Sequence, residues 1–371
     1  MAKKHVVYIV SHIHKSLAFE WIVSGLRKDI KFTFILLNPS GSLLEDFLIH
    51  HQINVKRITY RNKKDFIPAF LKTFFFLLFK RPQIVHAHLL DAQLIGLTAA
   101  WFAGIRKRIY TRHNSNYHHV YHPQGVKFDL WSNKLATHII SISQATDVTL
   151  HQLENASASK IIKIPHGFDL NLFAEVPAIR VDSIKAKWNI PADRPIVGVI
   201  ARHIEWKGIQ FIIPAFKKFL EQYPTATLVL ANASGPYHET LLKLLSDVQK
   251  NHIVLIPFEE DVTALYPVFD MYVHTPVDSL CEAFGQTYCE ALAAGIPSIF
   301  TPSGIGAEFI QNEKNALLVD FQNSDSIYKA MINLWGNPEL RNHLIKNGRQ
   351  DVFSKFGLDS MLNSLKKLYD A

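Results

Sequence analysis

The chain has 371 residues, of which 48% are hydrophobic and 19% are charged, and it has the composition of a globular protein. This length is too great for one ordinary hydrophobic core, so we expect two domains. The formal net charge of +8 is uneven, because residues 1–170 hold 22 Lys and Arg against 10 Asp and Glu, whereas the remainder holds 18 against 22. A basic first half indicates an anionic partner, which is nucleic acid, a membrane surface or a phosphorylated substrate.

Membrane spans and secretion signals are not expected. The most lipid-like stretch, Thr73 to Phe79, is far shorter than the roughly 20 residues that cross a bilayer. Val6 to Val10 is likewise too short for the apolar region of a signal peptide. Cys281 and Cys289 lie in one local segment and indicate no disulfide framework. We therefore expect a cytoplasmic protein.

Short apolar, β-branched runs recur along the chain and predict twelve strands. In the first half these runs are Val6–Ser11, Phe32–Asn38, Gln83–His88, Arg108–His113, His138–Ser143 and Ile161–Gly167. In the second half they are Pro195–Ala201, Thr227–Ala233, Ile253–Phe258, Met271–Pro276, Ile296–Pro302 and Ala316–Phe321. Most are separated by stretches long enough for a helix, a pattern typical of parallel sheets covered on both faces.

The two sets of six strands are parted by the more polar segment Phe173–Pro195, which we interpret as a linker and a first connecting helix. The predicted fold class is therefore α/β, with two Rossmann-like, doubly wound domains facing a central cleft. Ligands of such sheets collect at the carboxyl ends of the strands.

The first strand is followed by Ser11-His-Ile-His-Lys-Ser16, a turn without glycine, which argues against a nicotinamide or flavin enzyme. A Walker A pattern is also absent, and no Cys/His spacing suits zinc. The histidines of "HNSNYHHVYH", His118, His119 and His122, are expected to be solvated loop residues. We therefore predict no metal site.

The second domain opens with "VGVIARHIEWKGIQFI", which places charged residues at the end of its first strand. Arg202 follows that strand, and Lys207-Gly208 begins an amphipathic helix. Arg offers a planar fork to phosphate oxygens and Lys a compact charge, so the pair favours phosphate binding. Taken alone, the same spacing is also compatible with two surface charges.

A second motif is "CEAFGQTYCEALAAGIPSIF", residues 281–300. Gln286 to Ala294 predicts a short helix that Gly295 ends. Glu282 lies in the loop that enters the helix, and Glu290 about one turn inside it. One interpretation is two solvated acids on a surface helix. The alternative is a ligand whose phosphate meets the helix N-terminus and whose hydroxyls meet the two carboxylates.

With these motifs in this order, the chain resembles the GT-B glycosyltransferases of the large retaining GT4 family. "IVHAH" at 84–88, "IPHGFD" at 164–169 and the terminal "LDSMLNSLKKLYDA" support the resemblance, which covers essentially the full length. It implies an acceptor-binding N-terminal domain, residues 1–175, joined by the C-terminal helix 355–371. Residues 176–354 are then the donor-binding domain.

The resemblance also implies roles for individual residues. Arg202 and Lys207 hold the donor diphosphate, Glu282 contacts sugar hydroxyls and Glu290 grips the ribose. His88 faces the donor sugar, where it positions and polarises rather than acting as the general base, and His113 is a weaker candidate. Backbone groups around the helix start complete the donor site, from Phe284, Gly285, Gln286 and Thr287. No cofactor and no divalent metal are implied.

This sequence departs from the family pattern in two places. Relatives often have a glycine-rich turn after the first strand, whereas here Lys15 is expected to supply charge instead. Relatives also carry a Pro-Ser pair shortly before the first glutamate. Here "TPVDSLCE" is longer, so Asp278 and Ser279 are not assigned.

The implied activity is retaining transfer of a sugar from a UDP- or GDP-sugar to a glycan or lipid-linked acceptor, in cell-envelope polysaccharide or lipopolysaccharide biosynthesis. The alternatives are a nucleotide-sugar epimerase of the same fold and, less favoured, a non-catalytic anion- or nucleic-acid-binding protein. No acid/base pair suited to epimerisation is recognisable, and no RNA-binding motif accompanies the basic half, so nucleic acid is not an expected partner. The sequence specifies neither the donor nor the acceptor nor the oligomeric state.

A basic cluster in the first domain suggests peripheral binding at the inner face of an anionic membrane. It consists of Lys56, Arg57, Arg61, Lys63, Lys64, Lys72, Lys80 and Arg81. The segment "FIPAFLKTFFFLLFKRP", residues 66–82, is interleaved with it and could add an amphipathic helix. The alternative is that Phe74 to Phe79 are core residues of a helix packed on the sheet.

Overall fold

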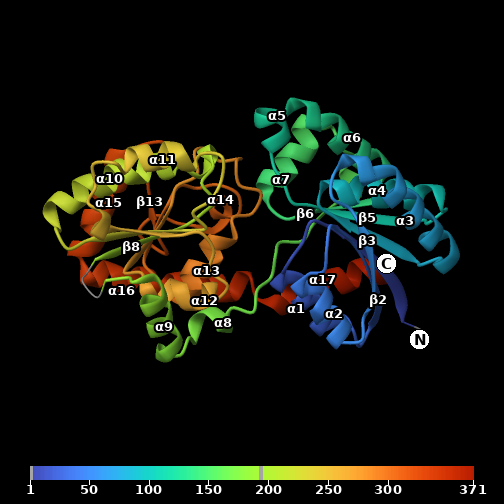
Figure 1. Ribbon diagram of the computed structural model, residues 1–371, viewed down its shortest axis with the longest axis horizontal. Helices are drawn as coiled ribbons and strands as arrows, with labels where there is room; N and C mark the ends of the chain where they lie inside the picture. Colours follow the sequence, from blue (N-terminus) through green and yellow to red (C-terminus); the bar gives the residue numbers. More distant parts are fainter. Residues whose placement is uncertain (1–2, 192–194) are drawn as a thin grey trace. The chain divides into compact units, whose positions relative to one another are not determined.

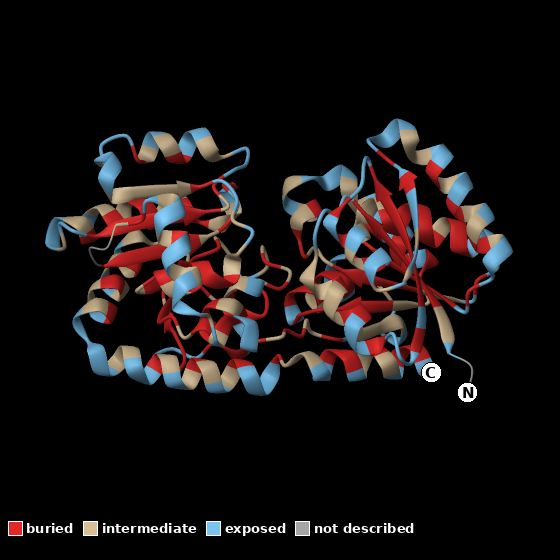
Figure 2. Ribbon diagram, turned by 60° about the horizontal axis from the view of Figure 1, so that its bottom comes forward, coloured by how far each residue is buried: buried red, intermediate tan, exposed pale blue. Residues whose placement is uncertain are grey.

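The computed structural model describes residues 3–191 and 195–371, which form two compact units. Unit 1 comprises Met1–Phe168 and Leu358–Ala371, and unit 2 comprises Asp169–Gly357. Each unit is built on one parallel sheet with helices on both faces (Figure 1). Figure 2 shows that the central strands are buried and that exposed residues lie mainly on helices and loops. The predicted α/β class with two doubly wound domains is confirmed.

The sheet of unit 1 has seven strands in the order β3-β2-β1-β4-β5-β6-β7. The strands are β1 (Lys4–Ser11), β2 (Ile30–Asn38), β3 (Asn54–Thr59), β4 (Ile84–His88), β5 (Lys107–Arg112), β6 (His138–Ser141) and β7 (Ile161–Lys163). The main helices are α1 (Leu17–Leu26), α2 (Leu43–His50), α3 (Phe66–Lys80), α4 (Leu90–Phe102), α5 (Tyr117–Tyr121), α6 (Val126–Leu135), α7 (Gln144–Val148) and α17 (Leu358–Asp370).

The core of unit 1 forms around the two central strands. β4 is buried along its whole length, and β1 from Val6 to Ser11, because helices cover both faces of the sheet. On one face Val7 and Ile9 pack with Leu77 of α3 and Ile95 of α4. The near-continuous apolar runs of the sequence are therefore explained by burial on both sides.

The C-terminal helix α17 belongs to unit 1. Its buried residues recur at helical spacing and are Met361, Leu362, Leu365, Leu368 and Tyr369. The Tyr369 hydroxyl lies 2.8 Å from Nδ1 of His86 and also hydrogen-bonds the Tyr8 hydroxyl. Two central strands, β1 and β4, are thus tied to the last helix of the chain.

The sheet of unit 2 has six strands in the order β10-β9-β8-β11-β12-β13. The strands are β8 (Ile196–Ile200), β9 (Thr227–Ala231), β10 (Ile253–Ile256), β11 (Met271–His274), β12 (Ser298–Phe300) and β13 (Leu317–Leu318). The main helices are α8 (Asn171–Ala174), α9 (Ala178–Trp188), α10 (Ile209–Gln222), α11 (His238–Leu244), α12 (Val262–Leu265), α13 (Gln286–Ala294), α14 (Gly306–Phe309), α15 (Ser324–Gly336) and α16 (Pro338–Lys355). Because β8 and β11 are neighbours, the loops that leave their carboxyl ends meet at one edge of the sheet.

All twelve predicted strands are present, and the structure adds a thirteenth, β3. Its sequence, NVKRIT, was not recognised because β3 is an edge strand in which only Ile58 is buried. Lys56 and Arg57 are exposed, and charged residues are a common way to protect a sheet edge from further pairing. Among residues 3–191 and 195–371, no helix combines the length and apolar character needed to cross a membrane.

Candidate active site

The loop after β8 holds two of the predicted cations in different settings. Arg202 is exposed, but its backbone is fixed because the next residue, His203, is buried and its N–H donates to the Ser234 carbonyl at 2.9 Å. A 3-10 turn, Glu205–Lys207, then leads to Gly208, whose φ is 73°. A Cβ on Gly208 would lie 1.8 Å from the Thr275 carbonyl oxygen, so only glycine permits this approach. Lys207 is thereby brought against the loop that follows β11.

Lys207 and Glu282 form an ion pair in which Lys207 Nζ lies 2.5 Å from Glu282 Oε1. The same carboxylate oxygen lies 3.2 Å from Nε2 of His274, the last residue of β11. The Glu282 N–H donates to Ser303 Oγ at 3.2 Å, which fixes the backbone as well. Burial alone would raise the pKa of Glu282, but the neighbouring Lys207 and His274 lower it to about 2. Glu282 is therefore a carboxylate at every physiological pH.

The helix α13 begins beside this ion pair. Gly285, with φ of 83°, precedes its first residue, and a Cβ there would lie 2.6 Å from the Tyr288 ring. The first N–H groups of a helix have no partner within it, so they face whatever lies beyond Gly285. Gln286 is exposed and Thr287 half-buried at this N-terminus. The arrangement suits an anion.

Phe284 has a different position from its neighbours. Its side chain is buried and packs edge-on against Phe356, with ring centroids 6.0 Å apart. Its carbonyl accepts from the Ile305 N–H at 2.8 Å. Phe284 therefore anchors the loop, and its side chain does not point toward a ligand.

Glu290 lies one turn inside α13 and is held by a tyrosine. The hydroxyl of Tyr266 donates to Glu290 Oε2 at 2.7 Å. Burial raises the pKa of Glu290 to about 7, although the hydrogen bond from Tyr266 acts in the opposite direction. Unlike Glu282, it has no cation beside it among the described residues, so ligand hydroxyls that donate to it would favour its charged form.

The predicted residues of unit 2 thus come together at one edge of its sheet. The β8 loop supplies Arg202 and Lys207, and the β11 loop supplies Glu282 and the start of α13. His274 and Tyr266 were missed by the sequence analysis. His274 ends a strand, which is the same signal that drew attention to His88, whereas nothing local to Tyr266 indicates its contact with Glu290.

In unit 1, His88 lies at the carboxyl end of β4 within a cluster of histidines. Its Nδ1 lies 3.1 Å from Nε2 of His113, and its ring stacks on Tyr8 at a centroid distance of 5.0 Å. His113 in turn stacks on His166 at 5.7 Å. Burial, and then the neighbouring histidines, lower the pKa of His88 well below its ordinary value, so the ring is neutral. Its Nε2 is buried without a hydrogen-bond partner among the described residues.

Two other predictions concern unit 1. Lys15 is exposed and lies one residue before Ser16, the N-cap of α1. The expectation of solvated loop histidines was wrong for His118 and His119. His118 Nδ1 lies 2.6 Å from Asp129, and His119 Nε2 lies 3.3 Å from Glu154.

The two acids that hold these histidines also flank a buried arginine. Both carboxylates pair with Arg112, so His118 and His119 belong to a buried ion network. Only His122 of the three loop histidines is exposed. Across the part of the chain that the structure describes, no group of His, Cys, Asp or Glu is arranged to hold a metal ion.

Two doubly wound units, one of which places two cations, an acid and a helix N-terminus at a single sheet edge, define a protein of the GT-B class. Two family models match in succession: "Glycosyltransferase Family 4" over residues 19–172 and "Glycosyl transferases group 1" over residues 180–351. The chain belongs to the GT4 family of glycosyltransferases.

Solved structures share the fold over nearly the whole chain. The Anabaena protein Alr3699/HepE in complex with UDP and glucose superposes with a TM-score of 0.85, at 18% identity over 99% of each chain. Sucrose-phosphate synthase from Thermosynechococcus elongatus superposes with a TM-score of 0.78, at 18% identity over 99% of this chain and 98% of that one.

Curated relatives match over shorter stretches. The putative glycosyltransferase YtcC of Bacillus subtilis is 27% identical over 58% of this chain and 55% of its own length. The alpha-monoglucosyldiacylglycerol synthase of Acholeplasma laidlawii is 29% identical over 50% and 46%. A GDP-mannose-dependent phosphatidylinositol monomannoside mannosyltransferase of Mycolicibacterium smegmatis is 31% identical over 47% of each. The matched region thus covers about half the length of these curated relatives.

Proposed function

We propose that this protein transfers a sugar from a nucleotide-diphosphate sugar to a glycan or lipid-linked acceptor, with retention of anomeric configuration. The observation that carries the proposal is the Lys207–Glu282 ion pair at the N-terminus of α13, with Arg202 in the same loop as Lys207. This grouping offers cations for a diphosphate and a permanent carboxylate for sugar hydroxyls within one small region.

The chemistry follows from these charges. Breaking the bond between the anomeric carbon and the diphosphate leaves negative charge on the β-phosphate. Arg202, Lys207 and the free N–H groups at Gln286 and Thr287 would stabilise that charge from fixed positions. The departing phosphate can then take the proton of the acceptor hydroxyl on the same face of the sugar, so retention needs no dedicated base.

The two glutamates would divide the rest of the donor between them. Glu282, ionised and held by Lys207 and His274, accepts hydrogen bonds from hydroxyls of the sugar. Glu290 accepts from the ribose, whose two neighbouring hydroxyls suit one carboxylate. His88 is neutral and has a free ring nitrogen, so it suits hydrogen bonding to a sugar rather than proton abstraction.

The relatives indicate which donors and acceptors to expect. One acts on GDP-mannose and a phosphatidylinositol mannoside, another makes a glucosyldiacylglycerol, and the Anabaena structure contains UDP and glucose. We therefore infer a UDP- or GDP-sugar as donor and a lipid-linked or other cell-envelope acceptor. We infer further that the enzyme works in the cytoplasm, in polysaccharide or lipopolysaccharide assembly, as a peripheral protein at the inner face of the membrane.

The test is to incubate the purified protein with UDP- and GDP-linked glucose, galactose, N-acetylglucosamine and mannose, after thermal-shift screening of the same donors. We expect one donor to raise the melting temperature and to yield free nucleotide diphosphate together with a glycosylated acceptor. NMR of the product should give the same anomeric configuration as the donor. Isomerisation of the sugar without transfer would support an epimerase instead, and an inverted product would exclude the retaining mechanism.

A further inference from the structure

The helix α3 has an apolar stripe on its outer face. Its buried residues, Ala69, Thr73 and Leu77, recur every fourth position and face the sheet. The opposite face carries Ile67, Leu71, Phe75 and Phe79 at the same spacing, and all four are exposed. Ile67 is 69% and Phe79 79% exposed, where the outer face of a soluble helix is ordinarily polar.

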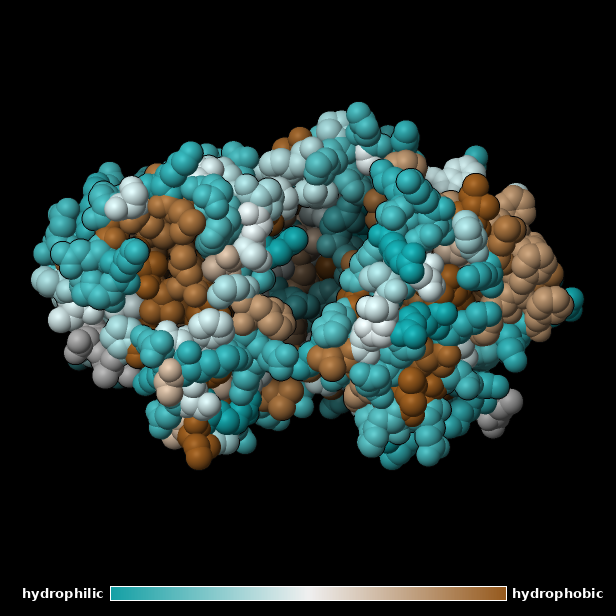
Figure 3. Space-filling view, viewed as in Figure 1, coloured by the Kyte–Doolittle hydropathy of each residue, from teal (hydrophilic) through white to brown (hydrophobic). Residues whose placement is uncertain are grey.

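The stripe continues onto the next helix. Trp101 and Phe102 at the C-terminal end of α4 are both more than half exposed. The ring of Phe102 lies 6.0 Å from that of Phe70 in α3, so the two helices present neighbouring surfaces. Figure 3 shows hydrophobic side chains gathered over α3, at the right-hand edge of the view. We call the six residues Ile67, Leu71, Phe75, Phe79, Trp101 and Phe102 the apolar face.

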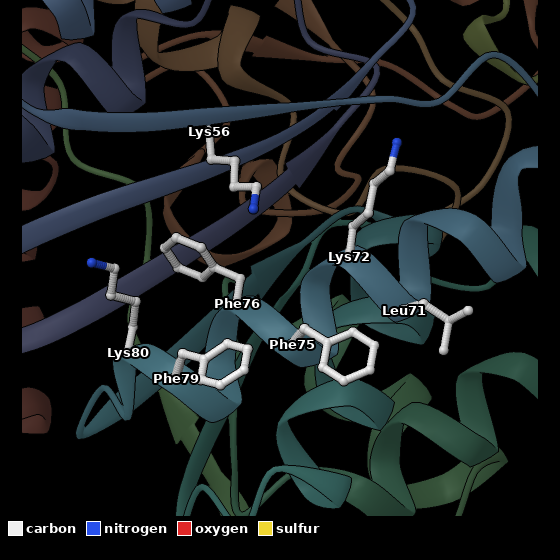
Figure 4. A pocket seen from close by; sticks show the side chains of 7 residues that line it. All are labelled: Lys56, Leu71, Lys72, Phe75, Phe76, Phe79 and Lys80. Carbon is white, nitrogen blue, oxygen red and sulfur yellow. The ribbon is translucent and has the colours of Figure 1, made fainter.

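Three lysines, Lys56, Lys72 and Lys80, border this apolar face, and we call them its lysine rim. A shallow groove of about 440 Å³ runs between α3 and the edge strand β3, and its lining contains three lysines and no acid. The groove is lined by Lys56, Leu71, Lys72, Phe75, Phe76, Phe79 and Lys80 (Figure 4). The Lys56 ammonium lies 5.1 Å from the centre of the Phe76 ring, while Leu71, Phe75 and Phe79 extend from α3 on another side.

The alternatives raised by the sequence are therefore both partly correct. Leu77 is core and Phe74 and Phe76 pack against the core, as expected for a helix on a sheet. Phe75 and Phe79 point outward and contribute nothing to that core. Their exposure needs a partner to explain it, because solvent-exposed aromatic rings in a contiguous patch typically mark an interaction surface.

We propose that the apolar face and its lysine rim dock this protein on an anionic lipid bilayer, an inference that rests on the proposed transfer to a lipid-linked acceptor. Aromatic and leucine side chains enter the interfacial zone, and the lysines meet anionic headgroups through their long, flexible stems. A second copy of the chain suits the surface poorly, because pairing this face with itself would bring lysines against lysines.

The test is co-sedimentation of the full chain with phosphatidylcholine vesicles that contain or lack phosphatidylglycerol. We expect binding only to the anionic vesicles, with a steep decrease as salt is raised because exposed charges are screened. Phe75→Ser with Phe79→Ser should weaken binding about tenfold or more, and Lys56→Glu with Lys72→Glu and Lys80→Glu should do the same.

Matched controls are available in unit 2. Phe258 and Ile179 are 64% and 77% exposed, so Phe258→Ser with Ile179→Ser removes similar apolar area elsewhere. Lys243→Glu with Lys346→Glu and Lys355→Glu changes the net charge equally on other exposed positions. Both control variants should bind anionic vesicles better than the corresponding variants of unit 1, and melting temperatures should confirm that all four remain folded.

Several results would overturn the docking proposal. The first is absence of binding to anionic vesicles at low salt. The second is a loss of vesicle binding in the control variants equal to that in the unit 1 variants. The third is a dimer, or a complex with an acidic protein, that only the unit 1 variants fail to form. Nucleotide-diphosphate affinity measured in solution separates this proposal from the catalytic one. It should be unchanged in the unit 1 variants, and a protein that binds vesicles but no nucleotide would leave docking intact while refuting sugar transfer.

Discussion

The ammonium of Lys207 lies 2.5 Å from the carboxylate of Glu282, although 75 residues separate them in the chain. They meet because β8 and β11 are adjacent in the sheet and Gly208 lets its loop approach the Thr275 carbonyl. The pair joins a residue proposed to bind phosphate to one proposed to bind sugar.

Replacing either cation, Arg202 or Lys207, should slow sugar transfer while the fold of the site is largely kept. We expect Arg202→Ala and Lys207→Ala each to lower kcat by about 100- to 1,000-fold, the scale for removing one fixed charge donor. Steady-state kinetics would measure this, with Lys243→Ala, an exposed lysine of α11, as the control. Near-normal transfer in both variants would show that the diphosphate lies elsewhere.

Stability at acid pH should report on the buried ion pair. Because the folded-state pKa of Glu282 is about 2, below its ordinary 4.5, its ionised form stabilises the protein above about pH 4.5. That contribution should be lost as pH falls toward 2. Urea unfolding of the wild type and Glu282→Gln should give curves that converge at low pH. Curves that stay parallel from pH 5 downward would refute the low pKa.

Nucleotide affinity should depend on the protonation of Glu290, whose pKa burial raises to about 7. If the carboxylate accepts from ribose hydroxyls, raising the pH from about 6 to 8 should strengthen nucleotide-diphosphate binding severalfold. Calorimetry on Glu290→Gln provides the control. The phosphates of the nucleotide ionise in the same way with this variant, but the variant lacks the titrating carboxyl. Identical pH dependence in the variant and the wild type would argue against the ribose contact.

Substitutions of Glu290 and of Glu282 should also have different effects on nucleotide binding and on sugar transfer. Glu290→Ala should weaken binding of the bare nucleotide, whereas Glu282→Ala should damage transfer and leave nucleotide affinity largely intact. Comparing Kd for the nucleotide with kcat for transfer in both variants measures the difference, and equal losses in both quantities would contradict separate roles.

Catalysis should proceed without a divalent metal. In the proposed mechanism, Arg202, Lys207 and the N-terminus of α13 would supply the positive potential that a metal ion can give. We expect activity to survive EDTA and to change little when Mg²⁺ or Mn²⁺ is added. Abolition by EDTA with recovery on adding either ion would show that these groups are insufficient.

Much of the fold was predictable because its central strands are buried on both faces and therefore read as continuous apolar runs. The helix from Gln286 to Ala294 was predicted with the bounds it has in the structure, since Gly285 and Gly295 flank it with positive φ. The strand β3 was not predicted because only Ile58 of this edge strand is buried and because it carries charged residues. The local sequence pattern therefore predicts those helices and strands that are buried to the same degree along their whole length.

The sequence allowed the residues of the candidate site to be predicted, but not the contacts between them. Spacing drew attention to Lys207 and Glu282 separately, yet their pairing depends on which strands are neighbours. The same holds for Tyr266 and Glu290, and for His118 and His119, whose carboxylate partners come from other segments. Such partners are set by tertiary structure, which the short motifs around each residue do not encode.

The position of α17 has a consequence for how the chain matures. Tyr369 hydrogen-bonds both Tyr8 and His86, so the central strands of unit 1 receive a partner from a helix that follows unit 2 in the sequence. Domains generally fold as units while the ribosome is still adding residues. Unit 2, which is continuous in sequence from Asp169 to Gly357, is therefore fully synthesised before unit 1 has its final helix. Although it begins first, unit 1 is the last of the two to be completed.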